Sequence, residues 1–124
     1  MKPRVLFIVL PYVVHNIDSN RSKIRSYFAF PYGVLSIATY NKDIADIKII
    51  DCDAEQVYQQ TIEGAMKEFK PDIVGLSMMF DNSYWYLPKI LELVRNINPT
   101  VLTLLGGAAA SYSYKEILSE QPFL

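Results

Sequence analysis

The chain has 124 residues, 51% of them apolar, so it is about one domain long and can bury roughly two-thirds of its unfolded surface without disulfide bridges. Its net charge of −1 excludes the basic field that drives nonspecific phosphate binding, and no nucleic-acid motif is present. A single cysteine excludes an internal disulfide bridge and a self-contained iron–sulfur cluster and is typical of a reducing compartment, so we expect a cytoplasmic protein.

The first predicted element is a strand over residues 5–10, a continuous apolar run without polar alternation. Such a run is typical of a central parallel strand that helices cover on both faces. Pro11 interrupts the run far short of the roughly 20 residues that a membrane helix needs, and no signal-peptide cleavage site follows. The sequence therefore predicts no membrane span.

The connection from Pro11 to Pro31 is longer than most strand-to-helix loops, which favours a functional role for it. It contains His15, the one histidine of the chain, but no partner motif for a metal ligand or proton carrier accompanies it. A solvated loop histidine is therefore the simpler interpretation. The residues directly after the first strand are neither glycine-rich nor acidic, which argues against a dinucleotide site, a phosphate-cradling loop and a receiver domain.

A helix over residues 32–42 and a strand over residues 47–50 are predicted next. The strand is short and partly alternating, which places it nearer a sheet edge. Asp51 ends this strand, where an acidic side chain can meet a ribose, yet Asp51 and Asp53 are better explained by the start of the following helix. Asp53 and Gln56 have the spacing of a capping box for that helix.

The remaining predicted elements are a strand over residues 73–78, a helix that begins near Tyr84 or Trp85, a strand over residues 101–105 and a short helix over residues 114–120. Pro88 lacks an amide hydrogen and is tolerated only in the first turn of a helix, which sets the start of the third helix. The aromatic residues 84–86 cannot all point inward from one turn, so at least one is expected to be exposed. An exposed ring there can pack on a cofactor or another domain, or be an isolated surface aromatic.

The alternation of four strands with four helices predicts an α/β fold. Right-handed crossovers give a doubly wound, Rossmann-like (flavodoxin-like) parallel sheet with helices on both faces, in which strands one and three flank the reversal of winding. A fifth strand would normally follow, but the sequence stops at Gln121-Pro122-Phe123-Leu124, where that strand should start, so we interpret residues 1–124 as a single domain from a longer chain. Ligands bind at the carboxyl edge of such a sheet, beside the loops 11–31, 79–83 and 106–111.

Small and polar residues follow the third and fourth strands at this edge. We expect Ser77 to face a groove and at least one of Met78 and Met79 to be buried. The diglycine 106–107 and the small residues 108–111 lack bulky side chains, which permits close approach of a ligand. A diglycine alone is equally well explained as a packing turn, but its place at the ligand edge favours binding.

The order of four segments resembles the N-terminal cobalamin-binding domain of radical S-adenosylmethionine enzymes, over nearly the whole chain. These segments are residues 5–8 with Pro11, residues 31–38, residues 70–77 and residues 105–107. The group that contains the anaerobic magnesium-protoporphyrin monomethyl ester cyclase and cobalamin-dependent methyltransferases is the most similar. The Asp-x-His-x-x-Gly motif of methionine synthase-type domains is absent around His15, so the resemblance implies cobalamin without a protein histidine on the cobalt.

The resemblance implies a cobalamin-binding accessory domain that presents a corrinoid to a downstream radical S-adenosylmethionine domain in the same polypeptide. The residues assigned to the groove are Pro11, Tyr12, Ser77, Met78, Gly106, Gly107 and Ala108. The 4Fe–4S cluster and S-adenosylmethionine belong to that downstream domain, since Cys52 alone cannot supply a three-cysteine motif. Catalysis by the parent methyltransferase or cyclase is then expected outside these residues.

Two alternatives stay open. The first alternative is a cofactor-free structural or interaction domain. It stays open because the family often has a histidine-containing stretch after the diglycine, whereas this chain has Ala108-Ala109-Ala110-Ser111. A flavin-binding flavodoxin-like domain is the other, and it ranks lower because no hydroxyl-rich phosphate loop follows the first strand.

Overall fold

The computed structural model describes residues 1–12, 30–55 and 58–124 of the chain. Its four strands form one sheet: β1 (Arg4–Val9), β2 (Asp46–Asp51), β3 (Ile73–Ser77) and β4 (Leu102–Gly106). The strand order is β2-β1-β3-β4, and every pairing is parallel. The predicted doubly wound parallel sheet is therefore confirmed, with the winding reversed between β1 and β3 and with β2 at an edge.

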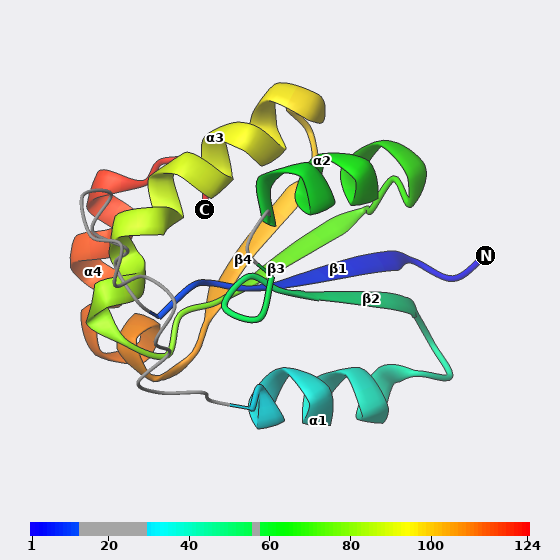
Figure 1. Ribbon diagram of the computed structural model, residues 1–124, viewed down its shortest axis with the longest axis horizontal. Coiled ribbons are helices and arrows are strands. Elements are labelled where there is room, and N and C mark those ends of the chain that lie inside the picture. The colour runs from blue at the N-terminus through cyan, green and yellow to red at the C-terminus, as the bar shows by residue number, and fades with distance from the viewer. Residues whose placement is uncertain (13–29, 56–57) are drawn as a thin grey trace.

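The strands alternate with the helices α1 (Tyr32–Asn41), α2 (Tyr58–Glu68), α3 (Leu87–Ile97) and α4 (Ala108–Glu120), and a 3-10 helix, η1 (Asp81–Tyr86), precedes α3. In Figure 1, α2 and α3 lie on one side of the sheet and α1 lies on the other. None of the helices in the described part of the chain is long and apolar enough to span a bilayer.

The larger core lies between the sheet and the helices α2, α3 and α4. Alternate residues of the central strands point into it, including Leu6 and Ile8 of β1 and Val74 of β3, which are all fully buried. The intervening residues face α1, where a much smaller core contains Val9, Tyr12 and Val34. The two sheet faces therefore differ greatly in how much apolar surface they bury.

The third and fourth helices begin at other residues than the sequence predicted. Residues 81–86 form a 3-10 turn and the α-helix begins at Leu87, with Pro88 in its first turn as expected. The prediction that residues 108–111 form a loop is wrong, because α4 begins at Ala108. Alanine is the strongest helix former, which suits residues 108–110 to the first turn of α4. Ser113 has non-helical backbone angles that interrupt the helix, and the sequence predicted only the part of α4 after it, residues 114–120.

Asp51 and Asp53 both accept hydrogen bonds from backbone N–H groups at the carboxyl edge of the sheet. The Asp51 carboxylate accepts hydrogen bonds from the backbone N–H groups of Asp53 and Ala54, at 3.0 and 3.3 Å. The Asp53 carboxylate accepts one from the N–H of Tyr12 at 3.3 Å, which joins the segments that leave β1 and β2. Gln56, the other half of the predicted capping box, lies outside the described residues.

Candidate functional site

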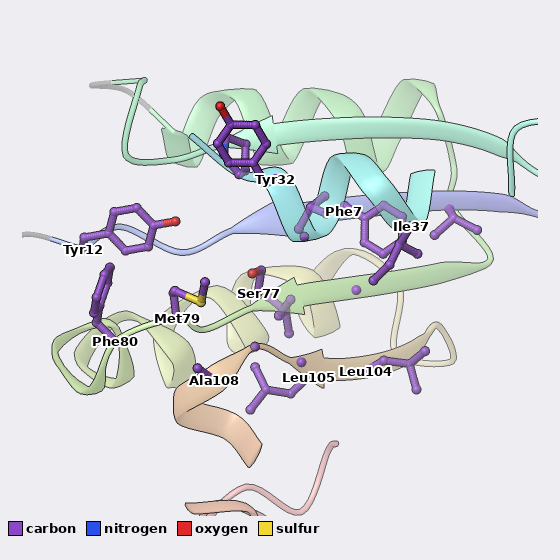
Figure 2. Close-up of a pocket in the computed structure, with 18 of the residues that line it drawn as sticks. Phe7, Tyr12, Tyr32, Ile37, Ser77, Met79, Phe80, Leu104, Leu105 and Ala108 are labelled. Carbon is purple, nitrogen blue, oxygen red and sulfur yellow. The ribbon is translucent and has the colours of Figure 1, made fainter. Parts of the chain in front are cut away.

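A pocket of about 930 Å³ lies on the face of the sheet that α1 covers only in part (Figure 2). It extends from Val5 and Ile73, near the start of their strands, to Ser77 and Gly106 at the carboxyl edge. Apolar and aromatic side chains dominate it, and none of the described residues that line it carries a charge. Its place at the reversal between β1 and β3 is where open α/β sheets bind ligands.

Phe7 and Gly75, on neighbouring strands, form the floor of this pocket. Two ring atoms of Phe7 lie 2.7 and 2.8 Å from the point where a Cβ on residue 75 would stand. The aromatic ring therefore fills the space that a side chain on β3 would need. Because strand residues alternate between faces, the same pattern turns Ser77 into the pocket while Leu76 is almost fully buried.

The turn from β4 into α4 leaves one end of the pocket without side chains. Gly107 has a φ of 104°, and a Cβ on it would lie 2.4 Å from the carbonyl oxygen of Met78, so this position requires glycine. A Cβ on Gly106 would meet nothing within 4 Å, so glycine at this position leaves space open in the pocket. Ala108 lines the pocket as the first residue of α4.

The two methionines after β3 point in different directions. Met78 is 1% exposed and belongs to the larger core, and its N–H donates to the carbonyl of Gly106 at 2.8 Å. Met79 is 46% exposed and lines the pocket beside Ser77 (Figure 2). The expectation that Ser77 faces a groove and that one methionine is buried is confirmed, but Met78 is the buried one and does not line the pocket.

Aromatic rings form the wall where β1 leaves the sheet. The rings of Tyr12 and Phe80 meet edge to face, with centroids 5.0 Å apart, and both line the pocket (Figure 2). Pro11 does not line it. Its carbonyl oxygen accepts a hydrogen bond from the hydroxyl of Ser83 at 2.7 Å, and Ser83 is completely buried. Pro11 thus fixes the segment that carries Tyr12.

The pocket brings together five of the residues assigned from the sequence: Tyr12, Ser77, Gly106, Gly107 and Ala108. The lining residues that were not assigned from the sequence include Phe7, Gly75, Met79, Phe80 and Leu104 and four residues of α1, namely Tyr32, Gly33, Val34 and Ile37. Strand residues two positions apart lie on the same face of the sheet, so Gly75 could have been identified from Ser77. No sequence signal indicates how α1 lies over the sheet.

Trp85, Tyr86 and Cys52, which were also weighed from the sequence, do not line this pocket. Trp85 is 62% exposed while Tyr86 is buried, which confirms that the aromatic triplet is partly exposed, and the Nζ of Lys89 lies 4.7 Å from the centroid of the Trp85 ring. Burial, with a smaller contribution from the charge of Asp51, raises the pKa of the Cys52 thiol to about 12. The thiol therefore stays protonated at neutral pH and is a poor nucleophile. His15 lies outside the described residues.

Comparison with known proteins gives one family and a set of longer relatives. A family model described as a B12 binding domain matches residues 25–124. An anaerobic magnesium-protoporphyrin IX monomethyl ester cyclase from Rubrivivax gelatinosus is 25% identical over 98% of this chain and 21% of its own length. A cytidylyl-2-hydroxyethylphosphonate methyltransferase from Streptomyces wedmorensis is 31% identical over 73% of this chain and 20% of its own length. The chain thus spans about a fifth of the curated relatives it matches.

A solved structure has the same fold. The cobalamin-dependent S-adenosylmethionine radical enzyme OxsB, with aqua-cobalamin and S-adenosylmethionine bound, superposes with a TM-score of 0.69 and 21% sequence identity. The match covers 99% of this chain and 16% of the OxsB chain.

Proposed function

This chain belongs to the B12-binding domain family, and we propose that its pocket holds cobalamin at the carboxyl edge of the sheet for use by another domain of the same polypeptide. The observation that carries the proposal is the pocket at the reversal between β1 and β3, whose described lining residues carry no charge and which the diglycine leaves open at one end. Open sheets of this type bind cofactors at that point.

The residues present fit a corrinoid. The corrin macrocycle is broad and mostly apolar, and the pocket offers apolar walls with a few polar atoms, such as the hydroxyl groups of Ser77 and Tyr12. We assign direct contact with the cofactor to Tyr12, Ser77, Gly106, Gly107 and Ala108. Pro11 and Met78 lie behind this surface and support it through their hydrogen bonds to Ser83 and Gly106.

The cobalt is expected to receive no histidine from the described lining, since that lining contains none. A bound corrinoid supplies a cobalt centre that can carry a methyl group. The role of this chain is then to bind and orient the macrocycle and to leave its outer face accessible from the carboxyl edge.

We infer that the parent protein is a cobalamin-dependent radical S-adenosylmethionine enzyme, because its relatives include a cyclase and a methyltransferase several times longer than this chain. The iron–sulfur cluster and S-adenosylmethionine are assigned to its downstream domain. Cys52, buried and protonated, is unsuited to hold a cluster.

Titration of the purified 124-residue chain with hydroxocobalamin tests the proposed binding. Binding is expected to shift the visible spectrum and to make cobalamin co-elute with the protein on gel filtration. Failure of the wild-type chain to retain cobalamin at high micromolar concentration would contradict the proposal and favour a cofactor-free interaction domain.

A variant that fills the pocket tests where cobalamin binds. Gly106→Leu places a side chain where a Cβ meets no atom within 4 Å, so the fold is kept while the pocket loses volume. We expect affinity for hydroxocobalamin to fall at least about tenfold, a cost of about 1.4 kcal/mol.

The matched control is Gly64→Ala on α2, where a Cβ also meets no atom within 4 Å and which does not line the pocket. This variant should bind cobalamin as the wild type does. Circular dichroism confirms that both variants are folded. Equal affinities of Gly106→Leu and wild type would place the cofactor elsewhere.

A further inference from the structure

The Phe7 ring lies across the boundary between two strands, partway along the pocket. Phe7 of β1 pairs with Gly75 of β3, and Gly75 pairs with Leu104 of β4, so the three positions form one row across the sheet. All three line the pocket, as does Ile37 of α1. Figure 2 shows Phe7, Ile37 and Leu104 farther from the carboxyl edge than Met79. Phe7 has the one aromatic side chain of this row.

Lining residues continue on both sides of this row. Ser77 and Gly106 lie toward the carboxyl edge, and Val5 and Ile73 lie toward the start of their strands. Alternate residues of a strand share a face, so these are the next positions along the same face of the sheet. The Phe7 ring therefore separates an outer part of the pocket, at the carboxyl edge, from an inner part over Val5 and Ile73.

Gly75 is the residue that lets the ring lie in this position. Its φ is not positive, so its backbone conformation does not require glycine. A Cβ on residue 75 would, however, stand 2.7 and 2.8 Å from two ring atoms of Phe7, which is closer than side chains approach one another. A glycine within a strand often marks such a close approach. The glycine on β3 is thus explained by the ring on β1.

The position of the ring bears on which ligands the pocket can take. The inner part is lined by aliphatic side chains, and the ring offers a flat apolar surface to a group that enters from the carboxyl edge. In cobalamin the flat aromatic group is the benzimidazole base, whereas the broad macrocycle and its polar amides suit the open edge. Aromatic groups pack well against one another, either offset or edge to face.

We propose that Phe7 selects among corrinoids by the size of the base, since its ring supports a benzimidazole in the outer part and closes the inner part to a longer base. This inference rests on the proposed binding of cobalamin and adds a specificity to it. Gly75 is a positioning residue in this account, because it acts through the Phe7 ring.

Three corrinoids that differ in the base test this role. They are cobinamide, which has no nucleotide, hydroxocobalamin, and the cobamide whose base is the longer naphthimidazole. Visible spectra give the dissociation constant of each. The wild type should bind hydroxocobalamin at least about tenfold more tightly than the naphthimidazole cobamide, a factor typical of a pocket that rejects extra carbon atoms. Phe7→Val removes the ring and should bind the two nearly equally.

Ile49→Val is the matched control. Ile49 pairs with Phe7 on the other neighbouring strand and packs against the same small core, but it does not line the pocket. This variant should keep the preference of the wild type for hydroxocobalamin. Circular dichroism confirms that both variants are folded.

Gly75→Ala gives a second measurement, which also decides the question if Phe7→Val does not fold. The added methyl group displaces the ring. The affinity for hydroxocobalamin should fall at least about threefold, as expected for residues in direct contact. The affinity for cobinamide should not change, because cobinamide has no base to meet the ring. In a Phe7→Val background, Gly75→Ala should have no effect on either ligand.

The outcomes separate this inference from the proposed function. Suppose that the wild type binds hydroxocobalamin but has no preference over the naphthimidazole cobamide, or that Phe7→Val keeps that preference as Ile49→Val does. The selective role of Phe7 is then overturned, and cobalamin binding stands. Equal losses of cobinamide and hydroxocobalamin in Gly75→Ala would overturn it as well, because the effect would not depend on the base. A wild type that binds none of the three corrinoids overturns both.

Discussion

Gly107 is the residue whose backbone geometry shapes the site most directly. Its φ of 104° lies in a region that side chains rarely adopt, and the carbonyl oxygen of Met78 occupies the space of a Cβ. The tight approach of residue 107 to residue 78 brings α4 against the exit of β3. The first turn of α4 and the end of β3 thereby meet at the pocket.

Gly107→Ala is expected to destabilise the fold by about 1–3 kcal/mol, because it adds both a strained φ and a contact with backbone that cannot move aside. Urea denaturation of the variant and wild type measures the difference. Gly106→Ala is the matched control and should be near neutral in stability, since its Cβ meets nothing within 4 Å. Equal midpoints for the two variants would contradict this account.

At the scale of the elements, hydrogen bonds join the segments that leave β1, β2 and β3 at the carboxyl edge. Ser83 of η1 donates to the carbonyl of Pro11, and Asp53 after β2 accepts from the N–H of Tyr12. Both bonds link residues far apart in sequence and hold the segment that carries the Tyr12 ring. The aromatic wall of the pocket thus depends on η1 and on the turn after β2.

Ser83→Ala removes the hydroxyl that satisfies the Pro11 carbonyl within a buried site, which is expected to cost about 1–3 kcal/mol. Affinity for hydroxocobalamin should fall as well, because Tyr12 loses its support. Ser119→Ala is the control. Ser119 is exposed and donates to Glu116 within α4, so its removal should change the free energy of unfolding by less than about 0.5 kcal/mol. A Ser83→Ala protein as stable as Ser119→Ala would refute this role.

Across the whole molecule, stability is distributed unevenly between the two faces of the sheet. The face toward α2, α3 and α4 contains the larger core, whereas the core on the face toward α1 contains, among the residues that the structure describes, Val9, Tyr12 and Val34. Val34 is the one buried residue of α1. The helix also lacks a side-chain hydrogen bond at its N-cap. Local unfolding of α1 therefore breaks few buried apolar contacts.

We expect the amides of α1 to exchange with solvent faster than those of α3, since local opening follows the amount of buried apolar contact. Saturation with hydroxocobalamin should slow exchange in α1, because Tyr32, Gly33 and Ile37 line the pocket, and should leave α3 unchanged. Exchange measured by mass spectrometry with and without cobalamin reports both effects. Exchange in α1 as slow as in α3 without ligand would contradict the first expectation.

The sequence by itself determined the order of strands and helices, the parallel sheet and the edge at which the site lies. Continuous apolar runs mark buried parallel strands, and abrupt small or polar residues mark their ends, so Ser77 and the diglycine 106–107 were predicted correctly as part of the pocket. The same residues, in their order, carried the resemblance to the cobalamin-binding family that the comparisons then confirmed.

Only the tertiary structure decided which side chains complete the pocket. Met79 lines it whereas Met78 is buried, and Pro11, which does not line it, accepts a hydrogen bond on its carbonyl from Ser83, 72 positions away. The sequence of α1 contains no charged residue, and its few polar residues do not form a strongly polar face that would indicate how the helix rests on the sheet. Packing against Val9 and Tyr12 sets that position, and so leaves the face of β3 and β4 open.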